Sequence, residues 1–178
     1  SDSNSTFNMY GGTISGNTAQ SGGGGVEVEN EESEFNIFAG SIINNSVTNT
    51  DGGLHKGGGV HFAAGTVKIQ GTNSDIIIKG NTVAGKDNNL YLRSGKKITV
   101  SNGASISSNS SIGVSSADCE GNSGRETVID NYGANNSRCF FLDGTNSSLY
   151  VLEYQNNSLT IVSKSSHKHS LTYISEKT

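Results

Sequence analysis

Short stretches in which apolar and polar residues alternate recur along the first two thirds of the chain. A strand with this period of two buries one face and exposes the other to solvent. Strands of only three residues are marginal in water on their own. The pattern therefore predicts short strands that gain stability from neighbours, at residues 7–9, 26–28, 60–62, 67–69, 76–78, 90–92 and 98–100.

Three sequence markers recur with one spacing of about 30 residues, which is typical of a repeat protein. The unit Ile-x-x-Asn occurs at Ile14/Asn17, Ile42/Asn45, Ile78/Asn81 and Ile106/Asn109, in steps of 28, 36 and 28 residues. A second phrase reads GGGVEV from Gly23, GGGVHF from Gly57 and NNLYL from Asn88. An apolar residue leads each unit, at Phe7, Phe35, Val67 and Ile98. One such unit cannot bury its own apolar face, but a stack of units can. The sequence therefore predicts a parallel β-helix with two or three short strands per coil.

The repeated isoleucine and asparagine acquire specific roles in such a stack. We expect the isoleucines to pile up as a core, at Ile14, Ile42, Ile78 and Ile106. We expect the asparagines to form a ladder in which each amide bonds to its copy in the next coil, at Asn17, Asn45, Asn81 and Asn109. The alternative is that these asparagines are unrelated turn residues at the surface. The glycine runs fit corners, where a positive φ or a missing Cβ is useful.

The sequence motif of the repeat resembles that of a known class of repeat proteins. The phrase F-x-M-x-G-G-T-I-S-G-N-T-A…G-G-G-V is similar to repeats of bacterial and protist surface proteins of the right-handed parallel β-helix, pectin-lyase-like class. It also resembles the GG[A/V/I] and FxxN repeats of chlamydial polymorphic membrane proteins. The resemblance is close over 7–28, good over 35–62 and faint to about residue 116. It implies a right-handed coil in a secreted or cell-surface protein, often an adhesin.

The last third of the chain, residues 117–178, loses the glycine phrase. We expect it to form irregular last coils or a C-terminal cap, in the same domain as the coils of residues 1–116. Short apolar runs at 127–129, 139–142, 149–152, 159–162 and 171–174 predict further strands. The two cysteines, Cys119 and Cys139, are expected to form a disulfide in an extracellular protein, the alternative being two thiols in a reducing compartment. Because the sequence begins inside a repeat unit at Phe7, with no capping segment before it, we expect the chain to be a fragment or the carboxyl end of a longer protein.

Composition supports an ordered all-β protein. The chain has 24 glycines, no proline or tryptophan, and a net charge of only −4. This charge argues against a nucleic-acid partner, and no apolar run is long enough to insert in a membrane. His61 alternates with Val60 and Phe62 and is expected to face outward. His167 and His169 could share one face of a strand, which is read as a polar tail and not as a metal site.

No catalytic constellation emerges from the sequence. The aspartates are dispersed, without a pair repeated at one coil offset, and we therefore expect no enzyme activity, no catalytic residue, no metal and no cofactor. Acceptor sequons for glycosylation begin at Asn4, Asn44, Asn135, Asn146 and Asn156, while Asn109 would be a poor acceptor inside the ladder.

We expect a non-catalytic, extracellular or cell-surface β-solenoid that acts as an adhesin, a stalk or a structural surface component. Its partner would be a protein or glycan of a host or neighbouring cell, or a second copy of the chain. The alternatives are a subunit of a self-assembling extracellular filament, and a carbohydrate-active or phage-tail-type β-helix.

Overall fold

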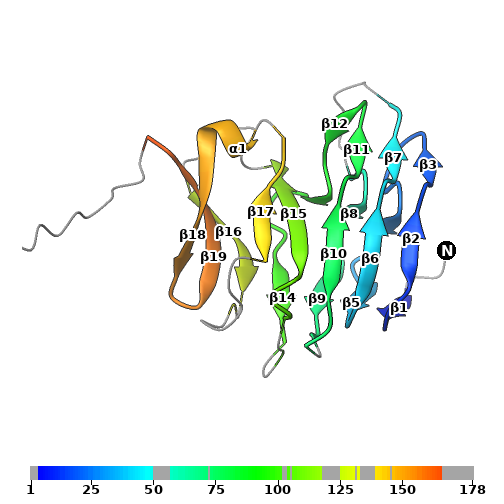
Figure 1. Cartoon of the computed structure of the whole chain (residues 1–178), viewed down its shortest axis with the longest axis horizontal. Helices are drawn as coiled ribbons and strands as arrows, with labels where there is room; N and C mark the ends of the chain where they lie inside the picture. The colour runs from blue at the N-terminus through cyan, green and yellow to red at the C-terminus, as the bar shows by residue number, and fades with distance from the viewer. Residues whose placement is uncertain are drawn as a thin grey trace, which may run out of the picture.

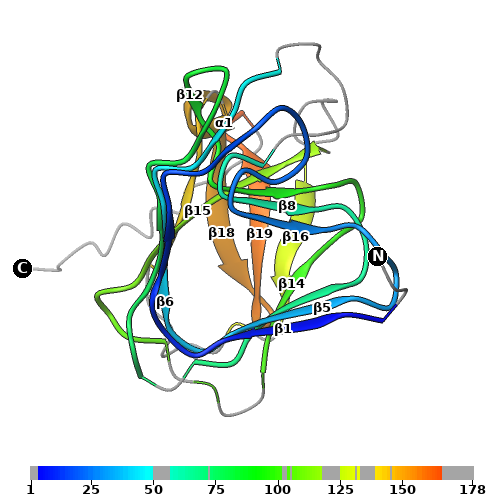
Figure 2. The same ribbon diagram turned by 90° about the vertical axis from the view of Figure 1, so that its right-hand side faces the viewer.

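The chain winds as a parallel β-solenoid of about four turns, with about 31 residues in each turn (Figures 1 and 2). The computed structural model describes residues 4–49, 57–71, 73–101, 104, 106–117, 125–130, 132, 139–144 and 146–165. Successive coils lie side by side along the long axis in Figure 1, and Figure 2 looks along that axis. The predicted fold class is therefore confirmed, while the right-handedness of the coil stays a prediction.

The first sheet takes one strand from each coil. In spatial order its strands are β1 (Thr6–Met9), β5 (Glu34–Ile37), β9 (Thr66–Ile69), β14 (Ile98–Val100), β16 (Arg125–Asp130), β19 (Ser158–Ser163) and β18 (Tyr150–Gln155). The pairs from β1 to β16 are parallel. Each three- or four-residue strand of the coils thus obtains the backbone partners that it could not find within its own repeat.

The second sheet has two arms that meet in one strand. One arm contains β2 (Thr13–Ser15), β6 (Gly40–Ile43) and β10 (Ile76–Lys79), and the other contains β4 (Val26–Val28), β8 (Val60–Phe62) and β13 (Leu90–Leu92). Both arms pair with β15 (Ser111–Ser116), which also pairs with β17 (Phe140–Leu142). In the fourth coil, β15 thus runs straight from one arm to the other.

In the first three coils the chain leaves the main body between the two arms. These excursions form a small third sheet from β3 (Thr18–Ala19), β7 (Ser46–Val47), β11 (Thr82–Val83) and β12 (Lys86–Asp87). The glycine phrase brings the chain back. A Cβ on Gly24 would overlap Gly58 O, and a Cβ on Gly58 would lie 2.6 Å from Asn88 O. The glycines are therefore required because backbones of adjacent coils nearly touch there, and only Gly22 of the first run has a positive φ, of 80°.

The core is a column of side chains along the axis, in strict register. Ile14 pairs with Ile42, and Ile42 pairs with Ile78, as predicted. Ile42, Ile78 and most of their inward neighbours are buried, and they belong to one hydrophobic cluster that also includes Ile161 of the last strand. The next residue in this column is Ile112 and not the predicted Ile106, because Ile112 is the partner of Ile78.

The last third of the chain continues both main sheets and then reverses direction. β19 lies antiparallel on β16, and β18 lies antiparallel on β19, so a hairpin ends the first sheet (Figure 1). One short helix, α1 (Asn146–Leu149), precedes the hairpin. Aromatic residues pack in this region, where the Tyr132 ring meets Phe140 and Tyr154 edge-on. The strands predicted over 117–165 form, and the predicted run at 171–174 lies outside the described residues.

Candidate functional site

A ladder of side-chain amides, which is buried from its second member onward, runs across the coils beside the third sheet. Asn17 Nδ2 donates to Asn45 Oδ1 at 2.9 Å, and Asn45 Nδ2 donates to Asn81 Oδ1 at 3.0 Å. Asn81 Nδ2 then donates to Asn89 Oδ1 at 2.9 Å, and Asn89 Nδ2 donates to Asp143 Oδ1 at 2.7 Å. Four amide donors thus point in one direction along the axis, and a carboxylate receives the last of them.

Each internal rung satisfies both the amide and the turn backbone. The Oδ1 of Asn45, of Asn81 and of Asn89 also accepts the backbone N–H of the asparagine before it in the ladder, at 2.8 to 3.1 Å. The second hydrogen of Nδ2 goes to a carbonyl of the preceding coil, Ile14 O for Asn45 and Ile42 O for Asn81. Such complete pairing offsets the cost of burying polar groups. The ladder therefore fixes the point at which each excursion leaves the coil.

The ladder differs from the sequence prediction at its fourth member. Asn17, Asn45 and Asn81 take the predicted places, but Asn109 is exposed, and its backbone N–H binds Ser107 Oγ. The reason is that Asn109 precedes β15, whereas each of these three rungs follows its core isoleucine, and the position three residues after Ile112 is Ser115 within β15. Asn89 and Asp143 take over instead, and the prediction for Asn109 was wrong.

Asp143 is the buried charged group of this site, with 3% of its surface exposed. Burial raises its pKa to about 6, partly opposed by the hydrogen bonds from the Asn89 backbone and side chain. The nearby charge of Asp87 raises this pKa further. Asp143 therefore binds a proton in a range where an ordinary aspartate is fully ionised.

The outward face of the first sheet carries a second, shorter row of polar contacts. Asn36 Nδ2 donates to Asn8 Oδ1 at 3.0 Å, and Gln70 Nε2 donates to Asn36 Oδ1 at 3.3 Å. Beside it, Lys68 Nζ lies 2.9 Å from Glu34 Oε1. The hydrogen bond from Lys68 lowers the pKa of Glu34, with smaller contributions from Asn36 and from the lysine charge. The sequence reasoning did not identify this row, although Asn8 and Asn36 recur at one offset in FNM and FNI.

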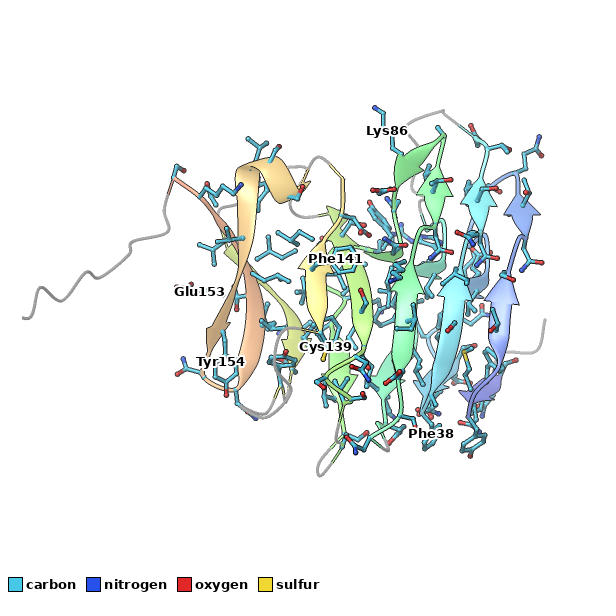
Figure 3. The ribbon with its side chains drawn as sticks, viewed as in Figure 1. Phe38, Lys86, Cys139, Phe141, Glu153 and Tyr154 are labelled. Carbon is cyan, nitrogen blue, oxygen red and sulfur yellow. The ribbon has the colours of Figure 1, made fainter. Side chains whose placement is uncertain are left out.

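Aromatic rings stack at the first coils. Phe7 lies on Phe35 with ring centroids 5.2 Å apart, and Tyr10 lies on Phe38 at 4.4 Å. Phe38 is at the lower corner of the solenoid in Figure 3. Because Phe7 and Tyr10 belong to the first coil, 43% and 70% of their surfaces are exposed. These rings form an apolar surface at one end of the stack of coils.

His61 is buried, with 2% of its surface exposed, although it was predicted to face outward. Its Nδ1 lies 3.2 Å from Glu27 Oε1, and its ring centroid lies 6.0 Å from that of Tyr91. Glu27, His61 and Tyr91 are register partners on β4, β8 and β13, so the outer side of this arm is itself packed. His167 and His169 lie outside the described residues.

No disulfide is seen among the residues that the structure describes. Cys139 is buried beside β17 (Figure 3), and its Sγ donates to Ser107 O at 3.4 Å. Burial raises the pKa of this thiol. Cys119, its predicted partner, lies outside the described residues, as does the sequon residue Asn135.

Three of the other predicted glycosylation sequons begin at exposed residues. Asn4, Asn44 and Asn156 are exposed, and the last two have positive φ angles of 56° and 47°. Asn146 begins α1. Since Asn109 is exposed and outside the ladder, the reason for setting its sequon aside no longer applies.

The described part of the chain contains no group of three or more His, Cys, Asp or Glu that could hold a metal ion. No helix in that same part is long and apolar enough to cross a membrane. Comparisons with protein-family models, with curated proteins and with solved structures found no match. The assignment of the fold therefore stands on strand register and hydrogen bonding alone.

Proposed function

We propose that the chain is a non-catalytic, extracellular or cell-surface β-solenoid that presents its outward side chains to a partner, as an adhesin, a stalk or a structural surface component. The observation that carries this proposal is the separation of the two roles in the strands β2, β6 and β10. Inward residues such as Ile14, Ile42 and Ile78 form the core, while their neighbours Thr13, Ser41 and Ile77 form a registered row on the outside.

This separation suits recognition. The outward positions can vary without removing core contacts, and the solenoid holds them on a stiff, regular lattice. The polar outer row, in which Asn8 is exposed, and the exposed ring of Tyr10 provide two kinds of contact, amide hydrogen bonds and an aromatic surface. We therefore infer a protein or glycan of a host or neighbouring cell as the partner, and we place the chain in the right-handed, pectin-lyase-like class of surface repeats.

A glycan array and a cell-surface binding assay with the labelled protein test this proposal. Tyr10→Ala and Lys68→Ala change outward positions, whereas Ser108→Ala, another exposed position, serves as the matched control. Binding that saturates, and that falls at least fivefold for one of the two outward variants with an unchanged circular dichroism spectrum, supports the proposal. Cleavage of an acidic polysaccharide by the purified protein would replace it with the carbohydrate-active alternative.

A second candidate function is self-assembly into an extracellular filament. It is favoured by the exposed rings of Phe7 and Tyr10, which lie on the edge strand β1 and in the turn that follows it. Light scattering over a hundredfold range of protein concentration separates the two functions, since only a filament grows with concentration.

A further inference from the structure

The first coil has one side that faces away from the second coil, at the right-hand end of the stack in Figure 1. The strands β1, β2, β3 and β4 lie at this side, and each of them is an edge strand of a described sheet. Each has a parallel partner in the second coil, at β5, β6, β7 and β8. On the other edge, none of them has a partner strand among the described residues. We call this side of the first coil the end face.

The apolar core is less covered at the end face than in the second coil. Phe7 has 43% of its surface exposed, whereas its register partner Phe35 is buried. Ile14 and Val26 are half-buried, although the residues that pair with them in the second coil are buried. A further coil would remove this apolar surface from water, which is the main driving force of protein association.

The aromatic rings of the first coil are stacked on one side only. Phe7 lies on Phe35 with an angle of 3° between the ring planes, and Tyr10 lies on Phe38 with an angle of 23°. The other face of each first-coil ring is therefore directed away from the second coil. A segment that adds a coil in register would place its own rings on Phe7 and Tyr10, as these two rings lie on Phe35 and Phe38.

The amides give the end face a direction. Between the first two coils, Asn36 Nδ2 donates to Asn8 Oδ1, and Asn17 Nδ2 donates to Asn45 Oδ1. A segment placed on the first coil in the same register would therefore accept from Asn8 Nδ2 and donate to Asn17 Oδ1. Within the described residues, no group accepts from Asn8 Nδ2 and none donates to Asn17 Oδ1. An asparagine at both positions of the added segment supplies the acceptor and the donor.

The end face carries no charged side chain on three of its four strands. Residues 4–26 contain no Asp, Glu, Lys, Arg or His, and the whole chain has no proline. Edge strands of natural proteins are commonly protected against pairing by a charged residue or a proline. A charge buried against this face would be desolvated without an opposite charge to compensate it. The segment that fits β1, β2 and β3 is therefore uncharged.

We propose that the end face is a docking site for an uncharged segment of another polypeptide, which lies on β1, β2 and β3 in parallel and repeats the pattern of the first coil. Main-chain hydrogen bonds to the edge strands hold the segment, and its rings and amides fix the register. The far end of a second copy does not offer such a segment, because its first sheet ends in an antiparallel hairpin and its ladder ends in Asp143. The pattern to be repeated consists of Phe7, Asn8, Tyr10, Ile14 and Asn17.

Binding of a synthetic peptide to the intact chain tests the proposal. The probe copies residues 4–19, NSTFNMYGGTISGNTA, and carries a fluorophore, while a peptide of the same composition in scrambled order is the control. Fluorescence anisotropy should reach saturation for the copy with a Kd of about 100 μM or tighter, and should not do so for the scrambled peptide. Asn17→Ala in the peptide should weaken binding at least about threefold, because the donor to Asn17 Oδ1 of the protein is lost. Equal binding of the copied and scrambled peptides, or no saturable binding of either, would overturn the proposal.

Variants of the intact chain locate the binding site of this peptide. Tyr10→Ala removes the exposed ring of the end face and should weaken binding at least about fivefold. Tyr154→Ala removes an exposed ring of β18, at the other end of the stack (Figure 3), and should leave the affinity unchanged. Lys68→Ala, in the third coil, should also leave it unchanged, which separates this proposal from the outward recognition surface proposed above. Unchanged binding to Tyr10→Ala, or an equal loss for Tyr154→Ala, would contradict the docking site.

Discussion

At the scale of single residues, an asparagine does in this fold what neither an apolar nor a charged side chain can do. Each internal rung meets two backbone groups of the preceding coil that need a partner, an N–H and a carbonyl. An amide has an acceptor for the first and a donor for the second. Asn45 and Asn81 use both, and they are almost completely buried. Alanine would leave both backbone groups without a partner, and aspartate would supply only the acceptor.

The central rung gives the first prediction. Asn81→Ala should destabilise the protein by about 3 kcal/mol, because the N–H of Asn45 and the carbonyl of Ile42 lose their side-chain partner in a buried place. Asn17→Ala removes the same residue type at the same offset in the exposed first coil, and it should cost less than about 1 kcal/mol. Urea denaturation of both variants measures the two values. An equal loss of unfolding free energy in both variants would mean that the position of an asparagine in the ladder does not affect stability.

At the scale of elements, the glycine phrase and the ladder depend on each other, because they pack against one another. The third glycine of each phrase, Gly25 or Gly59, lies against the amide of the following coil: a Cβ there would lie 3.1 Å from Asn45 Nδ2 or 2.7 Å from Asn81 Nδ2. In the third coil Asn89 occupies the same register position, since it precedes Leu90 as Gly59 precedes Val60. The position that is a glycine in the first two coils is thus an asparagine in the third, where its side chain forms a rung of the ladder.

Close backbone approach at these glycines gives the second prediction. Gly58→Ala should destabilise the protein by about 3 kcal/mol, since the new methyl group would be forced against Asn88 O and the backbone of Thr82. Gly85→Asn is the contrasting variant, because Gly85 has a φ of 74°, which asparagine tolerates, and nothing lies within 4 Å of its Cβ position. It should cost less than about 1 kcal/mol. Thermal unfolding followed by circular dichroism compares them, and a tolerated Gly58→Ala would refute the packing argument.

How far the sequence predicts this fold depends on whether an element repeats. The strands and the column of Ile14, Ile42 and Ile78 were predictable because three markers share one period and alternation identifies the buried face. The fourth coil was misaligned because its core strand is β15 (Ser111–Ser116), so Ile112 stands 34 residues after Ile78 while the Ile-x-x-Asn match at Ile106 is accidental. Asn89 could have been found from NNLYL, where an asparagine stands in place of the third glycine. Asp143 could not, because its rung spans a coil and 54 residues of sequence.

At the scale of the whole molecule, the two ends of the solenoid differ in chemistry. At the first coil, β1, β2, β3 and β4 are edge strands of the described sheets, and the rings of Phe7 and Tyr10 are exposed. Within the described residues, Asn17 Oδ1 accepts no hydrogen bond, whereas the corresponding oxygen of Asn45 accepts two. At the other end the first sheet turns into an antiparallel hairpin, and the ladder stops in the buried carboxylate of Asp143. The first rung thus ends in an amide oxygen, and the last rung ends in a carboxyl group that its own chain covers.

This asymmetry gives a prediction about assembly. In a head-to-tail stack, Asn17 Oδ1 of one copy would need an amide donor from the ladder of the next, but the ladder ends in Asp143, which carries no amide and is covered by its own chain. We therefore expect no filament growth between about 1 and 100 μM protein, in a range where specific protein contacts are normally detected. Light scattering and negative-stain electron microscopy measure this directly, at pH 5 and pH 8, so that both states of Asp143 are sampled. Filaments whose length increases with concentration would show that the edge strands and the exposed rings suffice for stacking without the ladder, and would favour self-assembly over the presentation of a recognition surface.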